Sequence, residues 1–182
     1  VHEIPDMGRA AKGRNIANLL ELQSGEKIAA LIRVESQQDE NKKDLTWQQE
    51  RFLFFATQSG TVKKTALSAY ANVRRTGINA IGINEGDRLI TVKLTTGHDE
   101  VVLITSDGKS IRFNEENVRS MGRTAAGVRG IRLGTKDRLV AAAIVAKEAT
   151  LLVAGENGIG KRTGFDEYRV QSRGGKGIIT MK

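Results

Sequence analysis

Hydrophobic and polar residues alternate with a period of two along most of this chain, which is the pattern of half-buried β-strands. In three places a β-rich run is followed by a two-residue turn signal and a second run with cations: FLFFATQSGTVKKT (52–65), VVLITSDGKSIRF (101–113) and LLVAGENGIGKRT (151–163). The turns are Ser-Gly, Asp-Gly and Asn-Gly, which favour tight hairpins because glycine accepts a positive φ without a clash. Since the turn glycines Gly60, Gly108 and Gly158 are 48 and then 50 residues apart, we predict three repeated β-hairpins.

A second motif, a loop closed by glycine, recurs between the hairpins and at both ends of the chain. Its copies are GRAAKG (8–13), RRTG (74–77), GRTAAG (122–127) and SRGGKG (172–177). After the closing glycine an alternating strand is expected to lead to a polar turn and then to another strand, namely KIAALIRV, RLITVKLT or RLVAAAIV. We expect the final run, IITMK, to start a further unit.

Each unit of about 50 residues is therefore expected to hold about four strands. This period suits the blades of a propeller-like disc better than helical repeats, whose apolar residues would recur every 3.6 positions. We predict an all-β fold with about three and a half repeats in one domain. The units are expected at residues 1–50, 51–100, 101–150 and 151–182. Helical turns are expected only around residues 65–72 and 114–119.

The first unit is longer than the others because it contains a polar insert at residues 35–50. The insert has five acidic residues, two lysines and the only tryptophan, Trp47. We expect it to form an exposed loop on one blade, ordered in part by Trp47. The insert has a net charge of −3, so the rest of the chain carries +11 and the positive charge belongs to the repeats.

Composition narrows the class of partner. The net charge of +8 and the pI near 9.9 point toward a polyanion. Aromatic residues are only 4%, which counts against an RNA-binding module built on base stacking. The chain has no cysteine, so disulfide scaffolds and thiolate metal sites are excluded. No apolar run approaches the roughly 20 residues of a membrane span, and we expect a soluble, cytoplasmic protein. Because the chain starts at Val1, we expect an excised fragment.

Motifs for catalysis are weak in this sequence. GENGIGKR (155–162) matches a P-loop up to Lys161, but Arg162 stands where a Ser or Thr should bind magnesium. The segment also falls in a predicted hairpin, whereas a P-loop needs a following helix. The two histidines, His2 and His98, are far apart and suggest no ligand cluster. We therefore expect no catalytic site, no metal site and no cofactor in this chain.

The basic residues recur at equivalent places in the repeats. One cation follows each hairpin glycine by four residues, and an arginine precedes the closing glycine by four residues in three copies. Cations at equivalent positions of stacked repeats would form a basic belt, which suits the backbone of a bent duplex. If these cations merely kept loops soluble, acids should share their positions, and they mostly do not. The candidate DNA-binding residues are Arg9, Lys12, Arg14, Lys63, Lys64, Arg74, Arg75, Arg112, Arg123, Arg129, Lys161, Arg162, Gln171, Arg173, Gly174, Gly175, Lys176 and Gly177.

The loop QSRGGKG (171–177) has two interpretations. Its glycines could let backbone N–H groups approach a phosphate closely, with Arg173 and Lys176 supplying charge. The alternative is a tight turn with incidental cations, and the two are compatible.

QSRGGKG also resembles the Gln-Arg-Arg-Gly-Gly-Lys-Gly box of the C-terminal domain of bacterial DNA gyrase A. GTVKKT, VRSMGRTAAGVRGIRL and GIGKRT are similar to that family too, and the resemblance covers nearly the whole chain. It implies a β-pinwheel of four-stranded blades, commonly six, that wraps double-stranded DNA around a basic rim. The wrap would support ATP-dependent negative supercoiling by the holoenzyme, an A2B2 assembly in which gyrase B joins through the rest of gyrase A.

The resemblance implies that ATP, magnesium and the catalytic tyrosine belong to other parts of the holoenzyme, and that the protein is nucleoid-associated. Tyr70 and Tyr168 match blade positions. Because Ser172 replaces the first Arg, the box is interpreted as a secondary, degenerate copy, with the first blade and later blades missing. The alternatives are the corresponding domain of topoisomerase IV and a propeller-like protein-interaction scaffold that does not bind DNA.

Overall fold

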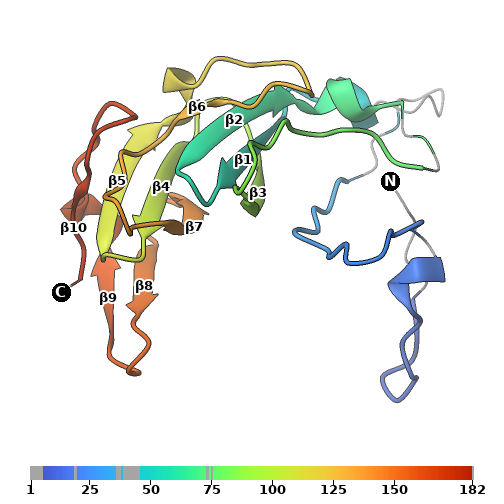
Figure 1. Ribbon diagram of the computed structural model, residues 1–182, viewed down its shortest axis with the longest axis horizontal. Coiled ribbons are helices and arrows are strands. Elements are labelled where there is room, and N and C mark those ends of the chain that lie inside the picture. The colour runs from blue at the N-terminus through green and yellow to red at the C-terminus, as the bar shows by residue number, and fades with distance from the viewer. Residues whose placement is uncertain are drawn as a thin grey trace.

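The structure is a computed structural model that describes residues 6–18, 20–35, 38, 46–72, 74 and 76–181. Within these residues the regular structure consists of ten β-strands and five short 3-10 turns, so the all-β prediction is confirmed. Figure 1 shows the hairpins following one another along an arc, from β1–β2 through β4–β5 to β8–β9. Each hairpin belongs to a separate sheet.

All three predicted hairpins are present. Their strands are β1 (Phe52–Thr57) with β2 (Thr61–Ala66), β4 (Glu100–Thr105) with β5 (Lys109–Asn114), and β8 (Thr150–Ala154) with β9 (Gly160–Gly164). The turn glycines Gly60, Gly108 and Gly158 have φ angles of 81°, 71° and 75°. These left-handed conformations explain why glycine follows Ser, Asp or Asn at each turn.

Two of the hairpins are completed by strands from two different units. The inner strands β3 (Leu89–Thr95) and β7 (Leu139–Ile144) pair with β1 and β4, while the outer strands β6 (Val128–Arg129) and β10 (Ile178–Ile179) pair with β2 and β5. The sheet orders are thus β3-β1-β2-β6 and β10-β5-β4-β7. The expectation that IITMK opens a new unit is corrected, because its first two residues complete the sheet of the previous one.

The closing glycines explain how the outer strand reaches its neighbour. Gly127 has a φ of 109°, and a Cβ there would overlap the carbonyl oxygen of Val62. Gly177 has a φ of 73° and the same relation to the carbonyl of Ser110. Only a residue without a side chain lets the two backbones approach this closely. The loop glycine is therefore needed for strand exchange between units.

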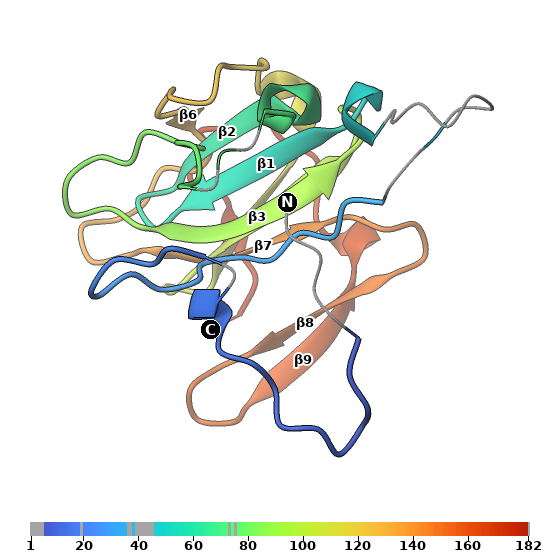
Figure 2. The ribbon, with the colours of Figure 1, turned by 90° about the vertical axis from the view of Figure 1, so that its right-hand side faces the viewer.

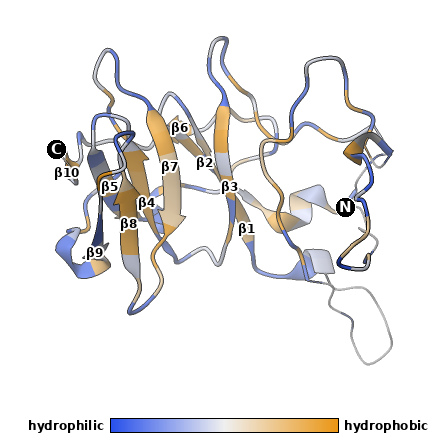
Figure 3. Cartoon of the chain, turned by 90° about the horizontal axis from the view of Figure 1, so that it is seen from below, coloured by the Kyte–Doolittle hydropathy of each residue, from blue (hydrophilic) through white to orange (hydrophobic). Residues whose placement is uncertain are grey.

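The core lies between successive sheets. The largest apolar cluster contains Phe54 and Val62 from the first sheet and Leu103 and Phe113 from the second, all buried. The rings of Phe54 and Phe113 are 6.4 Å apart and tilted. Figure 3 shows the apolar strands β4, β7 and β8 between polar connections. Because apolar residues from two units share each cluster, neighbouring units stabilise each other.

Short 3-10 turns follow the hairpins. The turns η3 (Leu67–Tyr70) and η4 (Glu115–Asn117) confirm the two predicted helical turns, and η5 (Phe165–Glu167) is an equivalent turn that the sequence analysis missed. The remaining turns, η1 (Ile16–Asn18) and η2 (Thr46–Gln48), also lie outside the two predicted stretches, so the expectation of helical turns only there is wrong. Tyr70, the last residue of η3, and Tyr168, directly after η5, are buried, in agreement with their assignment to blade positions.

The N-terminal unit differs from the others. The strand predicted for KIAALIRV (27–34) does not form, and Leu31 is 77% exposed. In Figure 2 residues 6–18 and 20–35 (blue) follow an irregular path outside the sheets. The equivalent strands β3 and β7 each pair with a hairpin of their own unit. Among the described residues before Phe52 there is no such hairpin for residues 27–34 to pair with. Most of the insert lies outside the described residues, but Trp47 packs against the cluster of Phe55, Tyr70 and Val92.

Candidate nucleic-acid interface

The loops at residues 122–127 and 172–177, called here the rim loops, run along the outer side of the arc (Figure 1). Each rim loop is bonded to the unit before it through equivalent groups. The carbonyl of Ala125 accepts from Gly82 N–H at 3.1 Å, and the carbonyl of Gly175 accepts from Arg132 N–H at 2.8 Å. These bonds place the two rim loops in equivalent positions on successive units.

The arginines of the rim loops fasten the loops as well. Arg123 Nη1 donates to the carbonyl of Asn79 at 3.5 Å, and Arg173 Nη1 donates to that of Arg129 at 3.1 Å. Arg173 Nε also donates to Asn117 O at 2.8 Å. Both side chains are half-buried, but a guanidinium has five N–H donors and can bind a phosphate at the same time.

The glycine N–H groups of QSRGGKG are partly used inside the protein. Gly174 N–H donates to the carbonyl of Gly130 at 2.6 Å, so it attaches the loop to the preceding unit. Gln171 N–H donates to the carbonyl of Arg112 at 2.8 Å. Lys176, by contrast, is exposed. Gly174 N–H is therefore used inside the protein, Gly174 and Gly177 have the positive φ of a turn, and phosphate binding by this loop stays a prediction.

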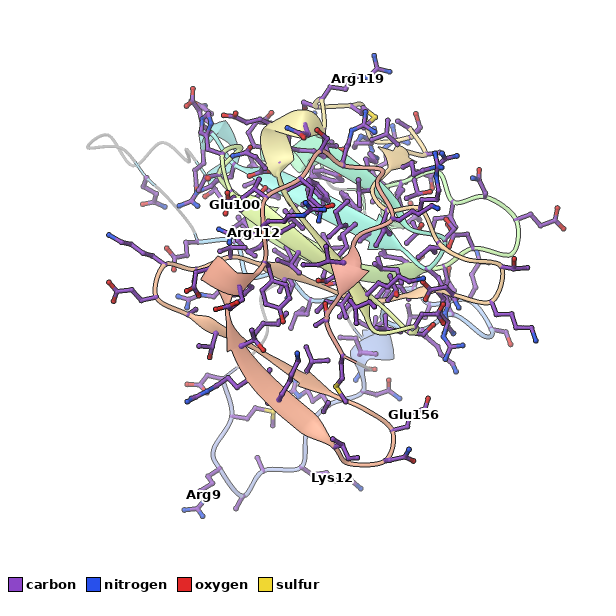
Figure 4. All side chains as sticks on the ribbon, turned by 90° about the vertical axis from the view of Figure 1, so that its left-hand side faces the viewer. Arg9, Lys12, Glu100, Arg112, Arg119 and Glu156 are labelled. Carbon is purple, nitrogen blue, oxygen red and sulfur yellow. The ribbon has the colours of Figure 1, made fainter. Side chains whose placement is uncertain are left out.

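Eight of the candidate cations are exposed. They are Arg9, Lys12, Arg14, Arg74, Arg129, Lys161, Arg162 and Lys176. Arg75 lies outside the described residues. Figure 4 shows Arg9 and Lys12 on the opposite side of the molecule from Arg119, so the first loop copy is not aligned with the rim loops. The basic belt stays a prediction, and its first loop copy lies apart from the two rim loops.

Lys63 is buried, contrary to its expected place on the surface. Its side chain is fully covered, and Nζ donates to the carbonyl of Ala80 at 2.6 Å and to that of Arg123. The ammonium also lies 5.2 Å from the centre of the Phe55 ring. Burial, together with the nearby charge of Arg123, lowers the pKa of Lys63 from 10.5 to about 8. Lys63 joins β2 to a rim loop and does not face solvent.

Lys64 and Arg112 are also directed into the protein. Lys64 Nζ donates to the carbonyl of Glu115 at 3.0 Å, and its side chain is nearly covered. Arg112 donates to the carbonyl of Phe165, to that of Tyr168 at 3.1 Å and to the carboxylate of Glu100. Figure 4 shows Arg112 beside Glu100, and both side chains are half-buried. Their expected place on the surface is corrected, because both cations satisfy carbonyls of the next unit.

Two exposed arginines near the rim loops were not among the candidates. Arg119 and Arg169 are 50 residues apart, and each stands three residues before the start of a rim loop. Arg119 stands at the edge of the molecule in Figure 4. The signal that could have found them is the repeat itself, since both follow a hairpin glycine by eleven residues.

The outer connections contain no acidic residue. Residues 71–83 have two arginines, residues 119–133 have four, and residues 169–179 have two arginines and one lysine, with no Asp or Glu in any of them. The insert, which is acidic, lies elsewhere along the chain. A positive potential therefore follows the outer side of the arc.

The acidic residues at turns have structural partners. Asp87 accepts from Ser59 N–H at 2.9 Å and from Ser59 Oγ at 2.6 Å, which ties the turn before β3 to the hairpin turn. Burial opposes ionisation of Asp87, but the hydrogen bonds from Ser59 and its neighbours outweigh it and lower the pKa. Asp137 accepts from Asp107 N–H in the equivalent place. Both carboxylates thus accept hydrogen bonds from hairpin-turn residues, which is a common role of aspartate at turns.

The structure also tests the catalytic alternatives. Residues 155–162 form the turn between β8 and β9 and the first part of β9, and a strand follows where a P-loop has an α-helix, so the P-loop interpretation does not fit this segment. Among the described residues no group of three His, Cys, Asp or Glu side chains could hold a metal ion. In the same part of the chain no helix is long and apolar enough to cross a membrane.

A family model described as DNA gyrase C-terminal domain, beta-propeller, matches residues 1–35, 51–96, 99–146 and 149–182. The chain belongs to this family. The match leaves out most of the insert and has one segment for each expected unit.

The curated proteins that are similar to this chain include gyrase A proteins. The gyrase A protein of Salmonella typhimurium is 44% identical over 182 residues, and that of Escherichia coli is 42% identical, each covering all of this chain and 20% of the relative. The chain thus spans about a fifth of the length of these relatives. The crystal structure of the C-terminal domain of DNA topoisomerase IV superposes with a TM-score of 0.84 at 29% identity, covering 98% of this chain and 53% of that one.

The structure of the DNA gyrase A C-terminal domain superposes with a TM-score of 0.74 at 24% identity, covering 92% of this chain and 53% of that one. This likeness supports the fold, and the expected propeller-like pinwheel is confirmed. The chain corresponds to the C-terminal part of the gyrase relatives alone, and their catalytic domain lies elsewhere in those proteins.

Proposed function

We propose that this chain is the DNA-binding and DNA-wrapping module of a type IIA topoisomerase, the C-terminal domain of gyrase A. Duplex DNA would bend around the outer side of the arc and support ATP-dependent negative supercoiling by an A2B2 holoenzyme with gyrase B. The observation that carries the proposal is the repetition of acid-free, arginine-rich connections, 50 residues apart, on one side of the molecule.

The proposed interface uses the cations that reach this outer side. It consists of Arg74, Arg119, Arg123, Arg129, Arg169, Arg173 and Lys176. Cations spaced along a curved edge neutralise successive phosphates, and each contact releases condensed counterions. Binding of this kind depends on charge and DNA deformability and is tolerant of sequence.

The test is DNA binding by the full gyrase assembly at increasing salt, with charge reversals on the outer side. We expect Arg119→Glu with Arg169→Glu to weaken binding to a long duplex, and to lower the slope of log affinity against log salt by roughly one per contact. The matched control is Lys147→Glu, since Lys147 is exposed beyond the inner strand β7. If both reversals left DNA retention intact, a protein-interaction scaffold would replace the proposal.

The corresponding domain of topoisomerase IV is the second candidate, because the topoisomerase IV domain superposes with the higher TM-score, 0.84 against 0.74. The curated relatives at 40–44% identity, however, are gyrase A proteins. The two are separated by activity of the assembled enzyme. Introduction of negative supercoils into relaxed plasmid supports gyrase, whereas relaxation and decatenation alone would support topoisomerase IV.

A further inference from the structure

The cation that follows each hairpin glycine by four residues occupies one repeated position. Its three copies are Lys64 in β2, Arg112 in β5 and Arg162 in β9. In all three hairpins it faces the same cross-strand position, in the pairs Phe54↔Lys64, Val102↔Arg112 and Leu152↔Arg162. The copies can therefore be compared directly.

In the first two copies the side chain binds the 3-10 turn of the next unit. Lys64 Nζ donates to the carbonyl of Glu115, the first residue of η4, and Arg112 Nη1 donates to that of Phe165, the first residue of η5. The acceptors are 50 residues apart, like the repeats. Both contacts thus join a hairpin to the turn of the following unit.

The backbone of the same residue makes a second contact with that unit. Met121 N–H donates to Lys64 O, and Gln171 N–H donates to Arg112 O, both at 2.8 Å. Both acceptors lie on the edge of the hairpin that the next unit approaches. The side chain and backbone together act as a clamp between units.

Each cation is also supported within its own hairpin. Lys64 Nζ lies 5.1 Å from the centre of the Phe52 ring, and Arg112 Nε donates to Glu100 Oε2 at 2.9 Å. Cations that are covered in this way need fixed acceptors, which the turn carbonyls supply. Because the acceptors are backbone groups, the clamp does not depend on the sequence of the turn.

Arg162 has the same register but a different environment. It is exposed, and its partner Leu152 is 71% exposed, whereas Phe54 and Val102 in the equivalent places are fully buried. Hairpin β8–β9 forms a two-stranded sheet, while the other two hairpins are in four-stranded sheets. Within the described residues, the third hairpin thus presents the clamp residue and the apolar face without a covering unit.

We propose that Arg162 is a positioning residue that clamps a further repeat of the same kind, through the backbone carbonyls of that repeat's 3-10 turn, and is not a DNA contact. Leu152 would be covered by the same repeat. The relatives leave room for such a unit, since the chain covers 53% of the solved topoisomerase IV domain and 20% of the curated gyrase A proteins. The expected geometry of the Arg162 contact is that of the equivalent contacts made by Lys64 and Arg112.

The experiment uses the full-length parent protein and compares Arg162→Gln, Arg112→Gln and Arg119→Gln. Without DNA, we expect Arg162→Gln and Arg112→Gln to lower the Tm of the C-terminal domain by roughly 3–8 °C, and to speed amide exchange in their own hairpins. Arg119→Gln, on the exposed outer side, should leave both unchanged. Arg162→Lys should keep the Tm of the unsubstituted protein, because a lysine, Lys64, occupies this position in the first copy.

DNA binding separates the clamp from the proposed interface. With a long linear duplex as the probe, Arg119→Gln should lower the salt slope of binding, and Arg162→Gln should leave it unchanged. The proposal is overturned if Arg162→Gln leaves the Tm and exchange unchanged in the absence of DNA, whatever it does to DNA binding. Since this stability readout needs no DNA, failure of the proposed DNA-wrapping function would not affect it.

Discussion

The loops GRAAKG (8–13) and GRTAAG (122–127) have nearly the same sequence and different structures. Loop 122–127 is held by hydrogen bonds from the buried Lys63 and from the N–H of Gly82, and Gly127 lies close against the carbonyl of Val62, whereas nothing lies within 4 Å of the Cβ position of Gly13. The difference shows that the loop sequence alone does not determine the loop's conformation and contacts. It becomes a rim loop only where a hairpin earlier in the chain receives its outer strand.

The largest effect is expected from a methyl group at the closing glycine. Gly127→Ala places a Cβ against the Val62 carbonyl at a φ of 109°, so we expect a loss of about 3–4 kcal/mol in the free energy of unfolding. Gly13→Ala, in open space, should change it by less than about 0.5 kcal/mol. Denaturant unfolding measures both, and equal losses would remove the distinction between the loops.

Removing the cation beneath the turn that leads into loop 122–127 is expected to have the next largest effect. In Lys64→Met, the carboxylate of Glu115, which is fully buried and 4.0 Å from Nζ, loses its cation. We expect a loss of about 2–3 kcal/mol, since hydrogen bonds from Gly97, Asp99 and Thr95 remain.

Lys12→Met in the first loop is the matched control for Lys64→Met. We expect no measurable loss in its denaturation midpoint, because Lys12 is exposed. If Lys12→Met lost as much stability as Lys64→Met, burial of the lysine would not explain its contribution to stability.

The pH dependence of stability should report Lys63. Because its pKa falls to about 8 in the folded state, the unfolded state binds more protons between pH 8 and 10.5, and stability rises as the pH increases through this window. We expect a gain of about 1–2 kcal/mol from pH 7.5 to 10. Lys63→Ile, which installs the residue found at the equivalent Ile111, should abolish the gain, as urea unfolding at several pH values can check.

The smallest effect on stability is expected for the exposed cations of the rim. Arg129→Gln and Lys176→Gln should each change the free energy of unfolding by less than about 0.5 kcal/mol while lowering the salt slope of DNA binding by roughly one. Arg14→Gln in the first unit is the comparison, measured by the same filter-binding titration. A slope change as large for Arg14 would place the first loop in the interface after all.

The sequence predicted the hairpins and the repeat because their signals are local. Ser-Gly, Asp-Gly and Asn-Gly specify turns without help from the rest of the chain, and alternation specifies the strands. Strand exchange could not be predicted in this way. The residues that direct it, Gly127 and Gly177, mark a close approach whose partner lies more than 60 positions earlier.

The candidate interface was predicted less well than the fold. Spacing placed Lys64, Arg112 and Lys176 in repeated positions, but it did not tell which side of the strand would be covered by the next unit. The flanking residues carried part of that signal, since Arg112 stands between the buried Ile111 and Phe113. Arg119 and Arg169 were missed because they belong to neither repeated loop.

The short outer strands have a consequence for cutting and joining this protein. A chain ending at residue 150 would contain every residue of the unit at 101–150 but would leave β5 without β10, whose residues Ile178 and Ile179 come from the next unit. A boundary drawn by sequence similarity is therefore not a folding boundary. Any excision, permutation or fusion that keeps one sheet whole must carry the loop and outer strand of the unit that follows it.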